Sequence, residues 1–305
     1  NVINSLLKIN LLGEIKLFNG LIDLMKPRVM SLVIFTCAVG LLTAPNYISV
    51  FDAIISIGFV TLGAGAAGAL NMWYESDVDA LMSRTCLRPI PTGKVKRNQA
   101  LYFGIILSIV SVAMLYYSAN LISAILLTST IGFYFFIYTI WLKRKTPQNI
   151  VIGGAAGALP PVIGWTIATG TITIEPIILF LIIFVWTPSH FWALSLYKSG
   201  DYKKAKIPML PVIAGTKTTK TNILAYSFAM LPVVIAPYYF EFASLLYLST
   251  ALVMTLYYNY LCLKLFKAKV TKFSNKIARK VFIFSIFYLF FIYLILLIDN
   301  ARSLF

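Results

Sequence analysis

Nine apolar stretches, each long enough to cross a bilayer, dominate this sequence of 305 residues. A helix needs about 20 mostly apolar residues to cross the hydrocarbon core, and inside lipid its backbone satisfies its own polar groups. Only 12% of the residues are charged, so a soluble fold is excluded and an all-α, polytopic membrane protein of nine transmembrane helices is expected. The stretches lie roughly at residues 29–45, 52–74, 100–118, 121–141, 150–169, 176–197, 222–240, 244–264 and 280–299.

Basic residues alternate between the segments that join these stretches. Residues 1–28 carry 4 Lys or Arg, and segments 75–99, 142–149, 198–221 and 264–280 carry 5, 3, 6 and 7, whereas the intervening segments carry none. Basic residues gather on the cytoplasmic side, so the N-terminus is expected in the cytoplasm and the C-terminus outside. The net charge of +16 therefore reflects membrane topology, and no nucleic-acid partner is expected.

One membrane domain is expected over residues 1–305. Within it, residues 1–28 form an amphipathic cytoplasmic segment that is suited to lie along the membrane surface. Residues 29–299 form the nine-helix bundle. Four spans separate the two long polar segments 75–99 and 198–221, which suggests two similar four-helix halves and a ninth helix.

Three of the ten acids stand together directly after the second apolar stretch, at Glu75, Asp77 and Asp79. If that helix continues, Asn71, Glu75 and Asp79 share one face because four residues separate each pair. Hard divalent cations such as Mg²⁺ take oxygen ligands from such groups and from phosphate. The spacing is consistent with a site for metal-bound diphosphate, and equally with a helix end that carries ordinary solvated carboxylates.

A second polar group ends the sixth apolar stretch, where His190, the only histidine, precedes Phe191 and Trp192. A histidine inside a helix bundle can bind haem iron or move protons. It can also link helices by hydrogen bonds, and the residues alone favour that packing role. Trp192 is open to two interpretations, a substrate-groove residue or part of the interfacial aromatic belt.

The stretch from residue 71 to 94 resembles the first signature of the UbiA superfamily of intramembrane prenyltransferases, an Asn followed by acids at four-residue spacing. More narrowly, its pattern N-x-W-Y-x-x-D-x-D-x-x-M-x-R-T-x-x-R-P-I-P-x-G is similar to the protohaem IX farnesyltransferase branch. The segment TPQNIVIGGAAGA at 146–158 resembles an element that lies near the diphosphate in that family. Segment 201–211 resembles the second signature, with Asp201 alone where the superfamily usually has two or more acids.

The resemblance implies nine helices around a central cavity and transfer of a farnesyl group from farnesyl diphosphate to the 2-vinyl group of haem b, which gives haem o. It implies Mg²⁺ as cofactor and haem b as substrate. It also implies a multi-pass protein of the bacterial or mitochondrial inner membrane, with the active-site mouth on the cytoplasmic side. Haem a synthase and oxidase assembly factors are the partners that such a pathway implies.

The resemblance also implies roles for individual residues. The expected metal ligands are Asn71, Glu75, Asp79 and Asp201, and with Arg84 and Arg88, which close over the phosphates, they form the catalytic set. The expected substrate contacts are Lys94, Lys145, Asn149, His190, Trp192, Lys198, Lys204, Tyr134 and Tyr138. Aromatic faces in that set are suited to stabilise an allyl cation, which has to be shielded from water.

Two other functions stay open. The first is prenylation of an aromatic acid or quinone precursor by a sibling enzyme, against which Met72 and the single acid Asp201 count. Most superfamily members have Asp where this chain has Met72. The second is an ion-coupled transporter, which predicts charges near the middle of the spans, whereas the acids here gather at span ends.

Overall fold

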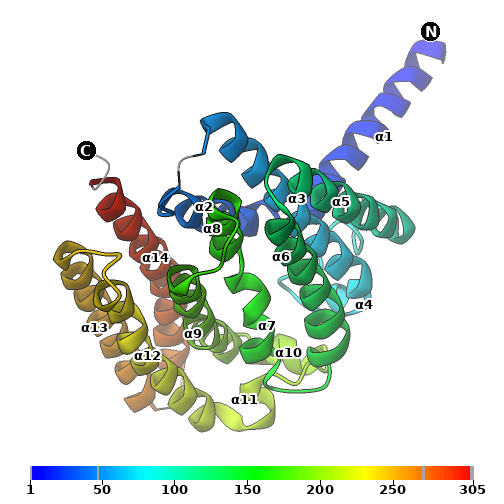
Figure 1. The fold of residues 1–305 in the computed structure, drawn as a ribbon. Coiled ribbons are helices and arrows are strands. Elements are labelled where there is room, and N and C mark those ends of the chain that lie inside the picture. The colour runs from blue at the N-terminus through cyan, green and yellow to red at the C-terminus, as the bar shows by residue number, and fades with distance from the viewer. Residues whose placement is uncertain (1, 47, 270–271, 303–305) are drawn as a thin grey trace.

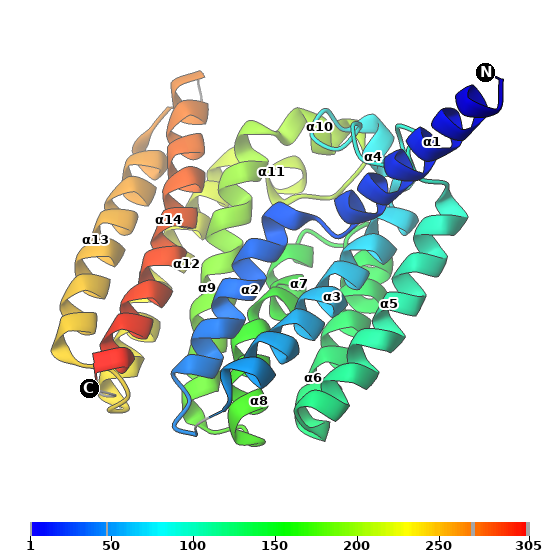
Figure 2. The ribbon, with the colours of Figure 1, turned by 90° about the horizontal axis from the view of Figure 1, so that it is seen from above.

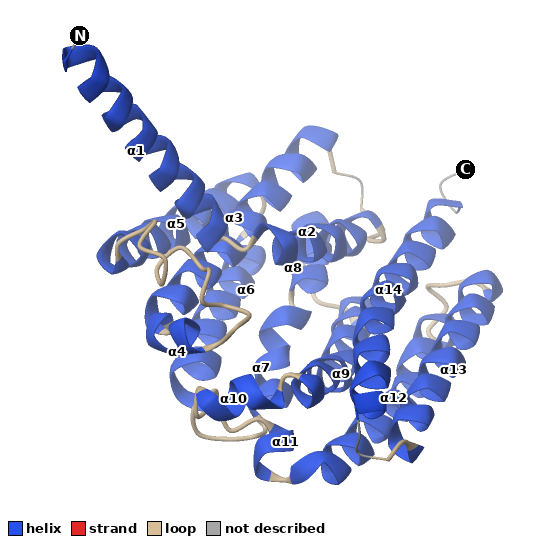
Figure 3. Cartoon of the chain, turned by 180° about the vertical axis from the view of Figure 1, so that it is seen from behind, coloured by secondary structure: helices blue, strands red, loops and turns tan. Residues whose placement is uncertain are grey.

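The computed structural model describes residues 2–46, 48–269 and 272–302, and all regular secondary structure in these ranges is helical (Figure 3). The elements are α1 (Val2–Leu24), α2 (Pro27–Leu42), α3 (Val50–Tyr74), α4 (Ser76–Leu81), α5 (Arg97–Ser118), α6 (Leu121–Gly132), the π-helix η1 (Phe133–Leu142), α7 (Asn149–Ala158), α8 (Pro160–Thr169), α9 (Ile174–Tyr197), α10 (Ser199–Lys204), α11 (Leu210–Ile213), α12 (Gly215–Tyr239), α13 (Leu245–Lys267) and α14 (Lys272–Arg302). The all-α prediction is confirmed.

The apolar stretches of the sequence correspond to these helices. Within the described residues, eight helices or joined helix pairs are long and apolar enough to cross a membrane. A further pair, Gly13–Leu24 and Pro27–Leu42, passes the same test but bends by 48° between its halves, so the number rises to nine if that pair is one span. Proline at the start of α2 explains the bend, because it lacks the backbone N–H that a continuing helix requires.

The helices pack side by side into one bundle, and α1 projects from it (Figure 1). The α7–α8 and α9 spans lie at its centre, since 72% and 67% of their most apolar windows are buried, against 22% for α5. The short helices α4, α10 and α11 gather at the end of the bundle from which α1 projects (Figure 2). The polar segments that follow α3 and α9 therefore meet at one end of the molecule.

Two glycines allow α2 and α8 to touch backbone to backbone. A Cβ atom at Gly164 would lie 1.9 Å from the carbonyl oxygen of Cys37, and one at Gly40 would lie 2.0 Å from that of Pro161. Small residues at such crossings let helices in membranes approach closely. Among the glycines of segment 150–169, Gly153, Gly154 and Gly164 are closely packed, whereas a Cβ at Gly157 would meet nothing within 4 Å.

Gly164→Ala is therefore expected to lower the free energy of unfolding by about 2–3 kcal/mol, the usual cost of forcing extra volume into a packed interior. Gly157→Ala is the matched control and is expected to be neutral or slightly stabilising, because alanine favours helix and meets no atom there. Thermal unfolding of both variants in detergent measures the difference. Equal melting temperatures would contradict the packing described for α2 and α8.

Candidate active site

The expected stripe of Asn71, Glu75 and Asp79 lies on two helices rather than one. Helix α3 ends at Tyr74, Glu75 has φ −95° and ψ 12°, and α4 begins at Ser76. The backbone N–H of Glu75 still donates to Asn71, and that of Asp79 to Glu75, so the three side chains stay close to one another along the chain. All three are buried, with 2%, 0% and 2% of their surface exposed.

Glu75 is the centre of a buried polar group that we call the Glu75 cluster: Lys26, Asn71, Glu75, Thr139 and Lys143. Its Oε2 accepts hydrogen bonds from Asn71 Nδ2 at 2.8 Å and from Lys143 Nζ at 2.5 Å. Lys26 Nζ donates to Asn71 Oδ1 at 2.7 Å, and Asn71 Nδ2 also donates to Thr139 Oγ1 at 3.1 Å. The cluster joins three segments that are far apart in the sequence, at the junction of α1 and α2, the end of α3 and the end of η1.

The charges of the cluster keep Glu75 ionised. Burial alone raises the pKa of its carboxyl group, but the charge and hydrogen bond of Lys143, with help from Lys26 and Asn71, lower that pKa below its usual value. The second oxygen, Oε1, is buried and has no hydrogen-bond partner among the described residues. A buried carboxylate oxygen without a partner is costly, so this atom has the capacity to bind a further cation or donor.

The π-helix η1 places an aromatic wall beside the cluster. The backbone N–H of Lys143 donates to the carbonyl oxygen of Tyr138, five residues earlier, which is the hydrogen-bond spacing of a π-helix. The hydroxyl of Thr139 donates to the carbonyl oxygen of Tyr134. The rings of Tyr134 and Tyr138 lie 5.3 Å apart, and each lies 5.8 Å from a lysine ammonium of the Glu75 cluster. Only glycine fits at position 153, because a Cβ there would lie 2.1 Å from the Tyr138 ring.

Asp79 is neutralised from within its own loop. Arg88 Nη1 lies 2.8 Å from both carboxylate oxygens of Asp79, and Thr85 Oγ1 donates to the Asp79 carbonyl oxygen. The preference of a residue before proline for extended backbone frees Arg88 from helix and allows it to turn back. Arg84 is exposed and forms no hydrogen bond or ion pair with any described residue, so its guanidinium remains available to a ligand.

The loops that carry the two acidic signatures are bound to each other. Ser83 Oγ donates to Asp201 Oδ2 at 2.5 Å, which links the loop after α4 to α10. Apolar side chains of both loops and of the start of α7 pack into one cluster: Val78, Met82, Ile150, Tyr202, Ala205, Ile207 and Met209. An open pocket of about 330 Å³ lies between the loops, and Asp77, Arg144 and Lys204 are among its lining residues.

The acids fit a metal ion that a substrate helps to hold, rather than a cage made by protein alone. Among the described residues, no three acids, histidines or cysteines converge closely enough to bind a metal ion. The unpaired Glu75 Oε1 and the buried, unpaired Asn149 Oδ1 are the hard oxygen donors that Mg²⁺ prefers. Mg²⁺ usually takes one or two carboxylates and completes its shell with water and phosphate, and a single free carboxylate oxygen such as Glu75 Oε1 is compatible with that pattern.

The other residues expected to contact substrate do not all lie at the Glu75 cluster. Asn149 is buried at the start of α7 and donates to the Thr146 carbonyl oxygen, whereas Lys145 is exposed just before it. Lys198 is half-buried at the C-terminal end of α9. Lys94 lies 3.8 Å from Asp23 of α1 in an exposed ion pair, which directs it away from the acids.

His190 and Trp192 contact other helices than those of the Glu75 cluster. His190 is stacked between Trp186 and Phe282, with centroid distances of 4.2 and 4.6 Å, and its Nδ1 lies 2.6 Å from Ser285 Oγ of α14. Trp192 is buried and meets Tyr226 of α12 edge to face at 5.5 Å. The hydrogen bonds and ring contacts of both residues thus extend toward α12 and α14.

Sequence reasoning missed four residues that the structure brings to the site: Lys26, Ser83, Thr139 and Lys143. Lys143 stands in a basic segment that membrane topology alone explains, so it carried no separate signal. Lys26 carried one, because the Lys-Pro-Arg element before the first apolar stretch resembles the family, but that element assigns it no role at the site. Thr139 did carry one, as a polar residue inside an apolar stretch. Ser83 carried none, since its partner Asp201 is 118 residues away.

The sequence pattern of the UbiA prenyltransferase family matches residues 32–286 of the chain. The chain belongs to this family. Among UbiA-family relatives, it is 67% identical over 301 residues to the Protoheme IX farnesyltransferase of Pelagibacter ubique. The aligned residues cover 98% of this chain and 99% of the relative. It is 51% identical over 278 residues to the Protoheme IX farnesyltransferase of Rhizobium rhizogenes, covering 91% and 87% of the two chains.

Solved structures share the UbiA-family fold at low sequence identity. A structure of digeranylgeranylglyceryl phosphate synthase matches with a TM-score of 0.77 and 18% identity over 94% of this chain and 99% of its own. A UbiA homolog from Archaeoglobus fulgidus bound to GPP and Mg²⁺ matches with a TM-score of 0.63 and 17% identity over 91% and 99%. The arrangement of helices is therefore the one this family uses.

Proposed function

We propose that this chain transfers a farnesyl group from farnesyl diphosphate to the 2-vinyl group of haem b and so makes haem o. The observation that carries the proposal is the 67% identity, over 98% of the chain, to a relative named Protoheme IX farnesyltransferase. The Glu75 cluster supports it, because a buried carboxylate beside two lysines and two tyrosines matches the needs of diphosphate departure.

The diphosphate binds at the Glu75 cluster in this proposal. Glu75 would hold Mg²⁺ through its unpaired Oε1, together with the diphosphate oxygens. Asn71, Asp79 and Asp201 would join the ligand set only by giving up their present bonds with Lys26, Arg88 and Ser83. The ion would supply a positive charge that stabilises the departing diphosphate. Lys26, Lys143 and Arg88 now donate hydrogen bonds to Asn71, Glu75 and Asp79. A diphosphate that replaced part of those bonds would be surrounded by three cationic side chains. The support from relatives is that a UbiA homolog of the same fold has been solved with GPP and Mg²⁺.

The chain's aromatic side chains protect the carbon that is transferred. As the allylic C–O bond breaks, both bonding electrons leave with the diphosphate, and the faces of Tyr134 and Tyr138 stabilise the allyl cation through their quadrupoles. The terminal vinyl carbon of haem b then supplies the electron pair of the new C–C bond. Water adds to the resulting cation next to the porphyrin ring and loses one proton, which gives the hydroxyethylfarnesyl product.

The orientation of the chain in the membrane is part of the same proposal. The end of the bundle that carries α4, α10 and α11 faces the cytoplasm, because the basic segments 75–99 and 198–221 lie there. The lipid bilayer then surrounds the spans of an inner-membrane enzyme, and haem a synthase or oxidase assembly factors receive its product.

Membranes that contain the chain, incubated with farnesyl diphosphate and either haem b or 4-hydroxybenzoate, test the function. The expected product is haem o, detected by mass spectrometry, with no prenylated benzoate. Membranes without the chain are the control. Prenylation of the benzoate with no change in haem b would overturn the proposal in favour of the quinone-precursor reaction.

His190→Ala is expected to raise the KM for haem b by about tenfold and to change the KM for farnesyl diphosphate by less than about twofold. The reason is the haem-side role that we propose for the imidazole, whose hydrogen bond runs to Ser285 of α14 and not to the Glu75 cluster. Ser285→Ala keeps the imidazole but removes its 2.6 Å partner, so it measures how much of the effect comes from positioning the ring. Equal changes in both KM values for His190→Ala would assign this histidine to structure only.

A further inference from the structure

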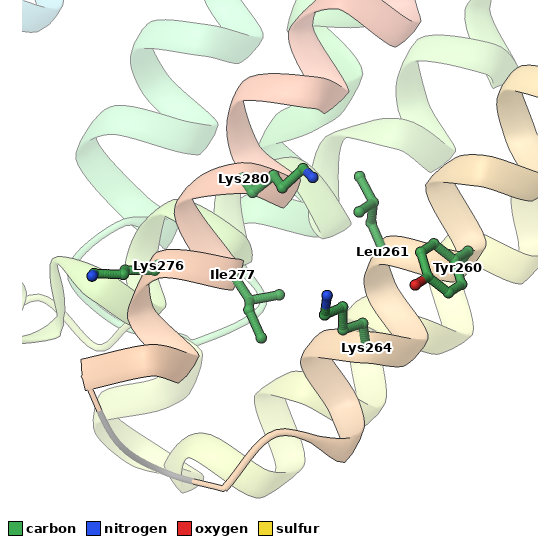
Figure 4. A pocket seen from close by; sticks show the side chains of 6 residues that line it. All are labelled: Tyr260, Leu261, Lys264, Lys276, Ile277 and Lys280. Atoms are coloured by element: carbon green, nitrogen blue, oxygen red, sulfur yellow. The ribbon is translucent and has the colours of Figure 1, made fainter.

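A second cationic site lies at the same end of the bundle, between α13 and α14. An open pocket of about 290 Å³ is lined by Tyr260, Leu261, Lys264, Lys276, Ile277 and Lys280. Figure 4 shows the ammonium ends of Lys264 and Lys280 reaching into the gap between the two helices. Lys276 also lines the pocket, although its ammonium end points away from the gap in this view.

No carboxylate of the described residues pairs with these ammonium groups. Helix α13 contains no acid, and the described acid of α14, Asp299, lies at the far end of that helix, where it is bonded to Ser244. The ammonium groups of Lys264 and Lys280 form no hydrogen bond or ion pair with any other residue that the structure describes. Two like charges on facing helices repel each other, so an anion between them is the partner that the geometry calls for.

The surface that adjoins the pocket is apolar and aromatic. One turn farther from the charged end, the rings of Tyr257 and Phe284 join the two helices with a centroid distance of 4.8 Å. Beyond them the outer surface carries exposed apolar side chains, including Val253 at 68% and Phe287 at 56% exposure. A molecule that fills both parts has an anionic head and an apolar tail.

We propose that the α13–α14 pocket binds the phosphate of an anionic phospholipid, whose acyl chains lie along the outer surface of α13 and α14. Basic pockets between membrane helices on the cytoplasmic side bind anionic head groups in this way. The site is separate from the Glu75 cluster, and its occupancy does not depend on the reaction that the chain catalyses.

Native mass spectrometry of the detergent-purified protein, titrated with phosphatidylglycerol or phosphatidylcholine, tests the site. The wild type is expected to retain phosphatidylglycerol and not phosphatidylcholine. In the double variant Lys264→Gln/Lys280→Gln, phosphatidylglycerol is expected to bind about 25-fold more weakly, since each lysine near anionic lipid contributes about fivefold. Lys276→Gln alone is expected to have the smaller effect.

The matched control is Lys217→Gln/Lys267→Gln, which removes the same charge from exposed lysines that do not line the pocket. It is expected to bind phosphatidylglycerol as the wild type does, and melting temperatures check that both double variants are folded. Equal weakening in the two double variants would overturn the proposal, because it would reflect net charge alone. Displacement of the lipid by millimolar inorganic phosphate or glycerol 3-phosphate would also overturn it, in favour of a site for soluble anions.

Discussion

Glu75→Gln is expected to reduce the rate of haem o formation by about 100- to 1000-fold, the range seen when one preorganised electrostatic contact to a developing charge is removed. The substitution keeps the size of the side chain and its hydrogen bond with Asn71, but removes the charge that binds the cation. Initial rates with purified protein, farnesyl diphosphate and haem b measure the effect.

Asp77→Asn is the matched control for that experiment, because it makes the same chemical change two residues away. Asp77 is 64% exposed and pairs at the surface with Arg144, and such pairs contribute little, about 0–1 kcal/mol. Its variant is expected to keep at least about a third of the wild-type rate. Comparable losses in both variants would contradict the central place of Glu75.

Lys143→Met is expected to be the most destabilising substitution near the site, at about 3–5 kcal/mol, because it leaves the fully buried Glu75 carboxylate without its nearest counter-charge. Proton uptake by Glu75 limits that cost at low pH, since a carboxyl group that loses its cation regains a higher pKa. Melting temperatures in detergent, compared at pH 7.5 and pH 5.5, measure both effects.

The double variant Glu75→Gln/Lys143→Met separates stability from catalysis. Removing both charges leaves no ionised group to bury, so most of the lost stability is expected to return. Activity is not expected to return, because the cation ligand is absent. A double variant as unstable as Lys143→Met would indicate that lysine packing, and not the charge pair, holds this region together.

The fold was largely predictable from the sequence because the spans are a compositional signal. Long apolar stretches separated by charged segments admit few interpretations, and the predicted ranges 52–74 and 176–197 agree with α3 and α9 within two residues at each end. The described residues hold eight membrane-capable spans, and the nine that the sequence predicts are reached when Gly13–Leu24 and Pro27–Leu42 are counted as one bent span.

The candidate site was less predictable, for two physical reasons. The break at Glu75 and the π-helix at 133–142 change local geometry without leaving a mark in hydrophobic periodicity, so the acids were placed on one straight helix. In addition, the partners of the acids come from distant segments, such as Lys143, 68 residues after Glu75. No spacing rule links residues that only tertiary packing brings together.

Whether the Glu75 cluster receives a cation-bound diphosphate is tested most directly by titrating purified protein with farnesyl diphosphate, without haem b, in Mg²⁺ and in excess chelator. The wild type is expected to bind about 100-fold more tightly with Mg²⁺, and Glu75→Gln to bind weakly in both conditions. Equal affinity with and without Mg²⁺ in the wild type, unchanged by Glu75→Gln, would contradict the account.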